Sequence, residues 1–213
     1  MKKVFALSAA LLTFSVSSAY AVQNQFYIGA DYIFTSNSLD KGSGTTYRNY
    51  NPSFSYTTDY AEDYSSPSVN IGYNFNEHFG IEAFYQTSST EKDKYYGVWN
   101  TLDTLSSETS FQAYGVDMIT YIASTDKVDW LASVGLAQYE YETEYKYHYL
   151  KRINKQTVED DGIGVRLGAG IQINFDRYIS FRAMYRYIFS DMDGLKHAQE
   201  LLVGVRVGFY PFY

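Results

Sequence analysis

The sequence predicts an all-β protein, an eight-stranded antiparallel up-and-down transmembrane β-barrel. Three observations support this fold: an amino-terminal export signal, eight segments in which apolar and polar residues alternate, and connections that are alternately short and long. Of the 213 residues, 46% are hydrophobic and 19% are aromatic, including 24 Tyr and 14 Phe. This composition indicates an ordered, core-forming chain with far more aromatic residues than a soluble domain of this size needs.

Residues 1–21 have the order of a secretory signal peptide. A pair of lysines precedes an apolar run from Val4 to Val16, and Ala19-Tyr20-Ala21 has the form of a cleavage site. The run is short for a transmembrane helix, which needs roughly 20 residues. We therefore expect cleavage at the end of this motif and a mature barrel comprising residues 22–213. No later stretch is apolar enough for a helix, so the exported chain either is soluble or enters a membrane through strands.

The first three alternating segments lie close together in the sequence. From Phe26 to Phe34, one face has apolar residues at every even position, and the opposite face carries Tyr27, Gly29, Asp31 and Ile33. From Ser68 to Phe75 and from Phe79 to Gln86, apolar residues occupy every odd position, and the opposite face is polar or Gly except for Phe84. A period of two is typical of a strand with two different faces. Only three residues separate the second segment from the third, which indicates a short turn.

The fourth and fifth segments are less regular. From Ser110 to Ile122 the alternation holds, except that Ile119 and Tyr121 fall on the polar side. The fifth segment crosses the bilayer from Trp130 to Gln138, and nine residues are enough for a tilted strand. Tyr then alternates with polar and charged residues over 139–149. We expect this continuation to project above the membrane.

The last three segments are the most regular. From Gly162 to Asn174, apolar residues alternate with Gly, Arg, Gln and Asn without exception. The segment from Ile179 to Tyr187 and the final one from Leu201 to Phe209 follow the same rule. These three complete the eight predicted strands.

The connections distinguish a membrane barrel from a secreted β-sandwich, whose strands would also alternate. Three short turns alternate with long connections, which we place at residues 37–65, 88–108, 147–161 and 189–198. This asymmetry is typical of outer-membrane barrels. In addition, the apolar face is continuous, and aromatic residues gather at the short-turn ends. We expect a periplasmic aromatic girdle formed by Phe26, Tyr73, Phe75, Phe79, Trp130, Phe175, Tyr178 and Phe209.

Charged residues on the polar faces should meet inside the barrel. Acids of the early strands and arginines of the late strands occupy the positions that alternate with the apolar face. They are Asp31, Glu82, Asp117, Arg166, Arg182, Arg186 and Arg206. Because the first strand abuts the eighth in a closed barrel, Asp31 and Arg206 should be near neighbours. Removing the partner of a buried charge costs about 3–5 kcal/mol, so we expect these groups to be paired. We interpret them as a network that fixes strand register and plugs a narrow lumen.

Several aromatic residues beyond the membrane are candidates for surface recognition, since a Tyr ring offers contact area with a hydrogen-bonding tip. They are Trp99, Tyr139, Tyr141, Tyr145 and Tyr147. The alternative interpretation is cross-strand stacking within a projecting hairpin.

The composition argues against most catalytic and nucleic-acid functions. A net charge of −7 disfavours phosphate binding, and the absence of Cys with only 3 His disfavours thiolate and metal chemistry. His197, close to Glu200, is the only candidate for a lipid-modifying hydrolase, and it lacks a suitably placed Ser nucleophile. We therefore predict no catalytic, cofactor or metal residues and no nucleic-acid partner.

The segments 26–30, 70–75, 164–175 and 202–209 resemble the small eight-stranded outer-membrane β-barrel family that includes OmpX, the transmembrane domain of OmpA and the opacity-type porins. The resemblance implies insertion by the barrel-assembly machinery, which reads a terminal strand ending in an aromatic residue. Tyr213 fits that requirement, whereas Pro211 departs from the pattern.

Together, these features predict a porin-like protein of the bacterial outer membrane with a side-chain-filled lumen and four long extracellular loops. Its expected role is in envelope structure or surface recognition. The expected partners are outer-membrane lipid or lipopolysaccharide and an extracellular ligand. A narrow channel and, secondarily, a lipid-modifying hydrolase remain as alternatives.

Overall fold

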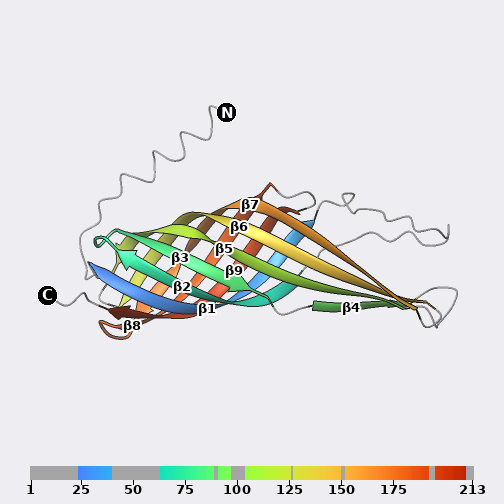
Figure 1. Cartoon of the computed structure of the whole chain (residues 1–213). Helices are drawn as coiled ribbons and strands as arrows, with labels where there is room; N and C mark the ends of the chain where they lie inside the picture. Colours follow the sequence, from blue (N-terminus) through green and yellow to red (C-terminus); the bar gives the residue numbers. More distant parts are fainter. Residues whose placement is uncertain are drawn as a thin grey trace, which may run out of the picture.

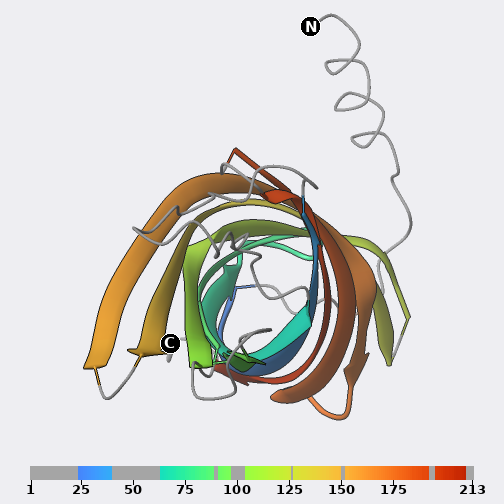
Figure 2. The ribbon, with the colours of Figure 1, turned by 90° about the vertical axis from the view of Figure 1, so that its right-hand side faces the viewer.

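The computed structural model describes residues 24–39, 63–88, 91–96, 104–125, 127–149, 152–191 and 195–209. They form a closed antiparallel barrel, shown from the side in Figure 1 and along its axis in Figure 2. Within this part of the chain, no helix is long and apolar enough to cross a membrane. The predicted signal peptide and the carboxy-terminal Pro211 and Tyr213 lie outside the described residues.

Nine strand segments form the eight strand positions of the barrel wall. The segments are β1 (Gln25–Leu39), β2 (Asp63–Asn74), β3 (Phe79–Thr87), β4 (Glu91–Tyr96), β5 (Thr104–Ser124), β6 (Val128–Tyr149), β7 (Arg152–Asn174), β8 (Ile179–Ser190) and β9 (Leu195–Phe209). β3 and β4 pair with successive parts of β5, so they occupy one position in the wall as a single interrupted strand. The order β3-β2-β1-β9-β8-β7-β6-β5 closes through the β3–β5 pairing, which confirms the predicted eight-stranded barrel.

Alternation along each strand separates the two faces of the wall. On β1, the side chains of Phe26, Ile28 and Phe34 are about half exposed, whereas those of Tyr27 and Asp31 are buried. The other strands repeat this pattern, because successive side chains of a strand point to opposite faces of the sheet. The apolar outer face and the mixed inner face are therefore set directly by sequence parity.

The predicted long connections are partly wrong. β6 ends at Tyr149 and β7 begins at Arg152, so most of the predicted loop 147–161 belongs to a long hairpin. Likewise, only residues 191–194 separate β8 from β9. The reason is that polar side chains do not end a strand when Tyr, Thr, Val and Ile continue to recur, since these residues favour extended backbone. Figure 1 shows β5, β6 and β7, with β4 alongside β5, running well beyond the remaining strands.

The lumen is less polar than we predicted. Ile119 and Tyr121, which broke the alternation of the fourth segment, are buried inside the barrel. They belong to an interior apolar cluster whose members are Ile33, Ile119, Tyr121, Leu131, Met184 and Leu202. An eight-stranded barrel is just wide enough for side chains to fill, so apolar residues pack between the charged ones.

Candidate functional site

The lower part of the lumen, toward the short turns, contains tightly hydrogen-bonded charges. Arg182 binds Asp31 through two nitrogens and binds Glu82 at 2.9 and 3.0 Å. Arg206 donates to Glu82 at 2.7 Å and to Gln172 at 2.9 Å. All five side chains are buried. Charge-assisted hydrogen bonds of this length link five strands, β1, β3, β7, β8 and β9, across the lumen.

A second, looser group lies next to the first. Arg186 contacts Asp117 at 3.3 Å and Glu200 at 3.9 Å, and Arg166 contacts the same two acids at 3.6 and 3.5 Å. The Arg166 guanidinium also lies 3.7 Å from the centroid of the Phe84 ring, a cation–π contact. The four arginines and four acids together form what we call the lumen network. It contains all seven residues that sequence parity placed inside, plus Glu200.

Arg206 lies on the strand next to Asp31, opposite Gly29, so the two are near neighbours as expected, but the ion pair of Asp31 is with Arg182. Asp31 and Arg182 both lie opposite Gly204 of β9, so the three residues share one rung of the sheet. A Cβ atom at Gly204 would overlap the Asp31 carboxylate, and the glycine thus leaves room for the ion pair. Arg206 lies one inward position lower and reaches Glu82.

Sequence reasoning missed Glu200 because it was considered with His197 at the mouth of the barrel. Its even position on β9 matches the inward Leu202 and Arg206, and this parity could have identified it. His197 has the opposite parity and stacks on the ring of Tyr187. His197 and Glu200 therefore lie on opposite faces of the wall, which removes the only candidate pair for a hydrolase.

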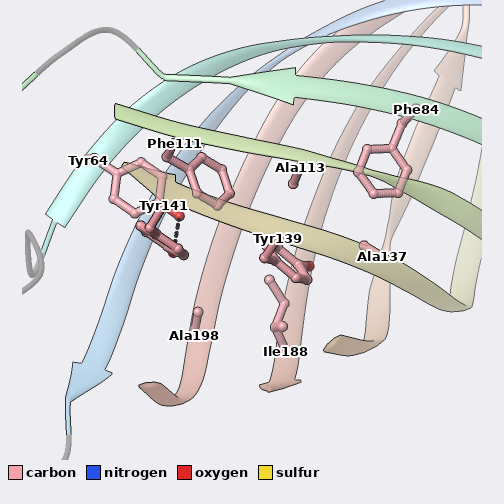
Figure 3. Close-up of a cluster of buried hydrophobic side chains, with 9 residues drawn as sticks. All are labelled: Tyr64, Phe84, Phe111, Ala113, Ala137, Tyr139, Tyr141, Ile188 and Ala198. Atoms are coloured by element: carbon pink, nitrogen blue, oxygen red, sulfur yellow. Dashed lines mark hydrogen bonds between the residues drawn. The ribbon is translucent and has the colours of Figure 1, made fainter. Parts of the chain in front are cut away.

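Above the lumen network, a cluster of apolar side chains occupies the lumen. Figure 3 shows Phe111 beside both Tyr64 and Tyr141, and its ring centroid is 4.9 and 4.8 Å from theirs. The hydroxyls of Tyr64 and Tyr141 are 3.0 Å apart and hydrogen-bonded, and the Tyr139 ring stacks on Phe111 at 6.0 Å. We call these four residues the aromatic cap, since they fill the lumen on the side of the long hairpin.

This position corrects part of the predicted recognition surface. Tyr139 and Tyr141 are only 2% and 4% exposed, and both point into the barrel. The physical reason is the alternation of the strand: Trp130 faces outward, so the odd positions from Leu131 to Tyr141 face inward. Trp99 and the side chains of Tyr145 and Tyr147 lie outside the described residues.

Little free space remains at the short-turn end of the lumen. A cavity of about 30 Å³ there is lined by polar residues that include Tyr27, Asp129 and Arg206. That volume suits roughly one or two ordered water molecules. Among the described residues, no group of three or more His, Asp or Glu side chains could hold a metal ion. At this end, the side chains of the described residues leave little room in the lumen.

Aromatic residues mark two borders on the outer face. All eight residues of the predicted girdle lie at the short-turn end, where six are exposed while Tyr73 and Phe79 are half-buried. We did not predict the second border. Its four outward tyrosines each donate a hydrogen bond to the polar residue above: Tyr32 to Ser65, Tyr85 to Gln112, Tyr114 to Glu140 and Tyr185 to Gln199. Amphipathic rings at both ends are typical of a band that lies in lipid.

Beyond this border, β5, β6 and β7 form what we call the projecting sheet. On its outer face, Lys146 lies 2.9 Å from Glu108, and Lys155 lies 3.0 Å from Glu144. The hydrogen bond from Lys155 holds the pKa of Glu144 below its ordinary value, and the one to Glu108 raises the pKa of Lys146. Lys155 is exposed and the other three groups are half-buried at the protein surface, so we assign these pairs an ordering role with little effect on stability.

One edge of the projecting sheet is open. β7 pairs with β6 over its whole length, but its pairing with β8 begins only at Gly164. Within the described part of the chain, no strand pairs with this edge from Arg152 to Glu159. The backbone N–H and C=O of Ile163 point to the β8 side, where they meet Asp191. The groups of Thr157 and Glu159, which have the same parity, therefore also point away from β6.

The family model for the outer membrane protein beta-barrel domain matches residues 6–209. The chain belongs to this family. In outer-membrane barrels the short turns typically face the periplasm and the longer connections face the cell exterior. The outward apolar band of this chain is accordingly the lipid-facing surface.

Solved outer-membrane barrels share the fold at low sequence identity. One of them is Ail, the attachment invasion locus protein of Yersinia pestis, whose structure was solved in complex with the heparin analogue sucrose octasulfate. Ail is 13% identical to this chain with a TM-score of 0.54, and the match covers 88% of this chain and all of Ail. Neisserial surface protein A is 19% identical with a TM-score of 0.54, and the match covers 86% of this chain and 97% of that protein. No curated protein matches the chain in sequence.

Proposed function

We propose that this protein is a non-conducting surface barrel that uses its projecting sheet to recognise an extracellular polypeptide. The wall and the filled lumen provide a rigid support, and the open edge of β7 provides the binding surface. The open edge is the observation that carries the proposal. A partner in extended conformation would add a strand there, with affinity from main-chain hydrogen bonds and specificity from alternate side chains.

The charges beside this edge favour a basic partner. On the outer face, Glu140 lies directly opposite Asp161, and Glu142 lies directly opposite Glu159. All four side chains are exposed, and like charges in opposite positions destabilise a sheet. Lysine or arginine side chains on an added strand would relieve this repulsion. These acids, at the end of the edge next to the barrel, are also unsuited to a sulfated polysaccharide such as the heparin analogue bound to Ail.

The lumen network and the aromatic cap support the non-conducting part of the proposal. A channel would need a water-filled path, whereas the charges inside are paired and the space above them is occupied by four rings. The narrow-channel alternative has no comparable support in the part of the chain that the structure describes.

Strand addition can be tested with a synthetic peptide and the protein in lipid nanodiscs. The probe is a fluorescent 12-residue peptide of alternating Thr and Lys, and its control has Glu in place of Lys. In the protein, Thr157→Pro removes one outward N–H without disturbing the β6 ladder, because an edge strand tolerates Pro on its solvent side. The matched control Thr157→Ala keeps the N–H.

We expect the basic peptide to bind the wild type and the Ala variant equally. Thr157→Pro should weaken binding about tenfold, the equivalent of one or two lost hydrogen bonds. The acidic peptide should not bind. Unchanged binding to the Pro variant would contradict recognition through the β7 edge, and binding of the acidic peptide would contradict the preference for a basic partner.

A further inference from the structure

The outer wall carries a groove that none of the features above explains. Its volume is about 540 Å³, and it lies over β1, β2, β8 and β9. The outward-facing residues that line it are Phe34, Ser36, Asp63, Ser65, Tyr185, Gln199 and Leu201. Small-molecule sites typically have volumes of roughly 300–1,000 Å³, so this groove is large enough for part of a lipid.

The lining changes from apolar to polar along the strands. The lower row is Tyr185, Leu201 and Phe34, which lie opposite one another on adjacent strands. The row above it, toward the cell exterior, is polar: Ser36 lies between Gln199 on one side and Asp63 on the other. The groove therefore crosses the border between the lipid-facing band and the aqueous surface.

Small side chains make this part of the wall concave. Ser65 lies directly opposite Phe34, and Ser36 is the next outward position above Phe34 on β1, so neither adds bulk beside that ring. The hydroxyl of Tyr32 is held by Ser65 at 2.8 Å, and that of Tyr185 by Gln199 at 2.7 Å. These bonds fix the rings at the rim. The Gln199 bond uses the side-chain oxygen, which leaves the amide nitrogen available to donate.

The polar row has the chemistry of a sugar site. The outward carboxylate of Asp63 accepts hydrogen bonds from hydroxyls, and the Gln199 amide donates to them. Among the described lining residues there is no Lys, Arg or His that could neutralise a phosphate. A phosphate would instead be repelled by Asp63. Below this row, the apolar residues are continuous with the lipid-facing band, so the lower part of the groove is in contact with acyl chains.

We propose that this groove binds a glycolipid of the outer leaflet. One acyl chain packs on Phe34, Leu201 and Tyr185, and sugar hydroxyls bond to Asp63 and Gln199. Such a lipid would be held at one place on the barrel, whereas the bulk lipid around the rest of the band exchanges freely. The assignment is independent of the peptide recognition proposed for the β7 edge, which lies on another part of the wall.

Native mass spectrometry of the refolded protein in detergent micelles tests the assignment. The probes are diglucosyl diacylglycerol, which lacks phosphate, and phosphatidylglycerol with the same acyl chains. Ser36→Trp fills the groove from an outward position and leaves the lumen untouched. Gln112→Trp makes a matched change above the aromatic border of β5, away from the groove. Each variant is first shown to fold by its gel migration before and after boiling.

We expect the wild type and Gln112→Trp to retain the glucolipid at least about fivefold more than phosphatidylglycerol, a ratio equivalent to one net hydrogen bond. Ser36→Trp should lose this excess, and Asp63→Asn should reduce it. Equal retention by Ser36→Trp and wild type, or equal retention of the two lipids, would overturn the assignment. Release of the glucolipid by EDTA would also overturn it, since binding would then depend on a bridging cation.

Discussion

At the scale of single residues, Glu82 is the centre of the lumen network. It is fully buried, and its two oxygens contact Arg182, Arg186 and Arg206 at 2.9, 3.8 and 2.7 Å. No other acid of the network contacts three arginines among the described residues. Its removal would leave several buried positive charges without full compensation. The stability of the barrel should therefore be more sensitive to Glu82 than to any exposed acid.

Glu82→Gln tests this dependence. Breaking a buried ion pair from one side costs about 3–5 kcal/mol, and we expect a loss of this size in the free energy of unfolding. Urea titration in phospholipid vesicles, followed through the fluorescence of the lipid-facing Trp130, measures it. The control is Glu142→Gln on the projecting sheet, which should change the free energy by less than about 0.5 kcal/mol. Similar effects of the two substitutions would contradict the central position of Glu82.

Glu144 provides a pH-dependent test outside the membrane. Its pKa is lowered first by the hydrogen bond from Lys155, with a further contribution from Lys146. Because the native pKa is the lower one, the carboxylate favours the ordered hairpin fully above its ordinary pKa of 4.5. This contribution is lost as the pH falls through the native value. NMR titration should give a midpoint below 4.5 that rises in Lys155→Ala; a native midpoint at or above 4.5 would contradict the contact.

At the scale of elements, sequence periodicity predicted the strands inside the membrane better than their extensions outside it. An apolar face against lipid makes every second residue of Gly162 to Asn174 hydrophobic, and such a strand is easily recognised. From Arg152 to Asp161 both faces of β7 are free of that constraint, so the residues show no apolar alternation although the ladder with β6 continues. In the sequence, the extension of this hairpin could be recognised only on β6, where Tyr alternates with polar residues.

A designed disulfide tests the register of this hairpin. Glu142 and Glu159 lie opposite each other in a pair that exchanges no hydrogen bonds, where Cα atoms are roughly 4.5 Å apart and a disulfide fits. The chain contains no Cys, so Glu142→Cys with Glu159→Cys should oxidise in air to one internal bridge. The diagonal pair Glu142→Cys with Thr157→Cys should stay reduced. Ready oxidation of the diagonal pair instead would show that the register is wrong.

At the scale of the whole molecule, the odd or even position of a residue along its strand determines whether its side chain faces the lumen or the lipid. Closure of the barrel determines which other side chains it contacts. The seven predicted lumen charges could be identified because each falls on the polar face of its strand. Their partners could not, since strand tilt and stagger decide which residues share a level. Asp31 meets Arg182 for this reason. Glu200 is a different case, because its even position on β9 could have identified it as inward-facing. Tyr139 and Tyr141 differ, because their inward parity could be read from Trp130 and was overlooked in favour of their position beyond the membrane.

Closure of the lumen is the central claim, because the proposed role as a rigid support depends on it. Planar-bilayer recording of the reconstituted wild-type protein measures it most directly, after incorporation has been verified by the shift in gel migration on boiling. A lumen filled by the ion-paired network and the aromatic cap predicts no steady current at moderate voltage. Discrete, long-lived conductance steps that scale with the amount of inserted protein would contradict the account.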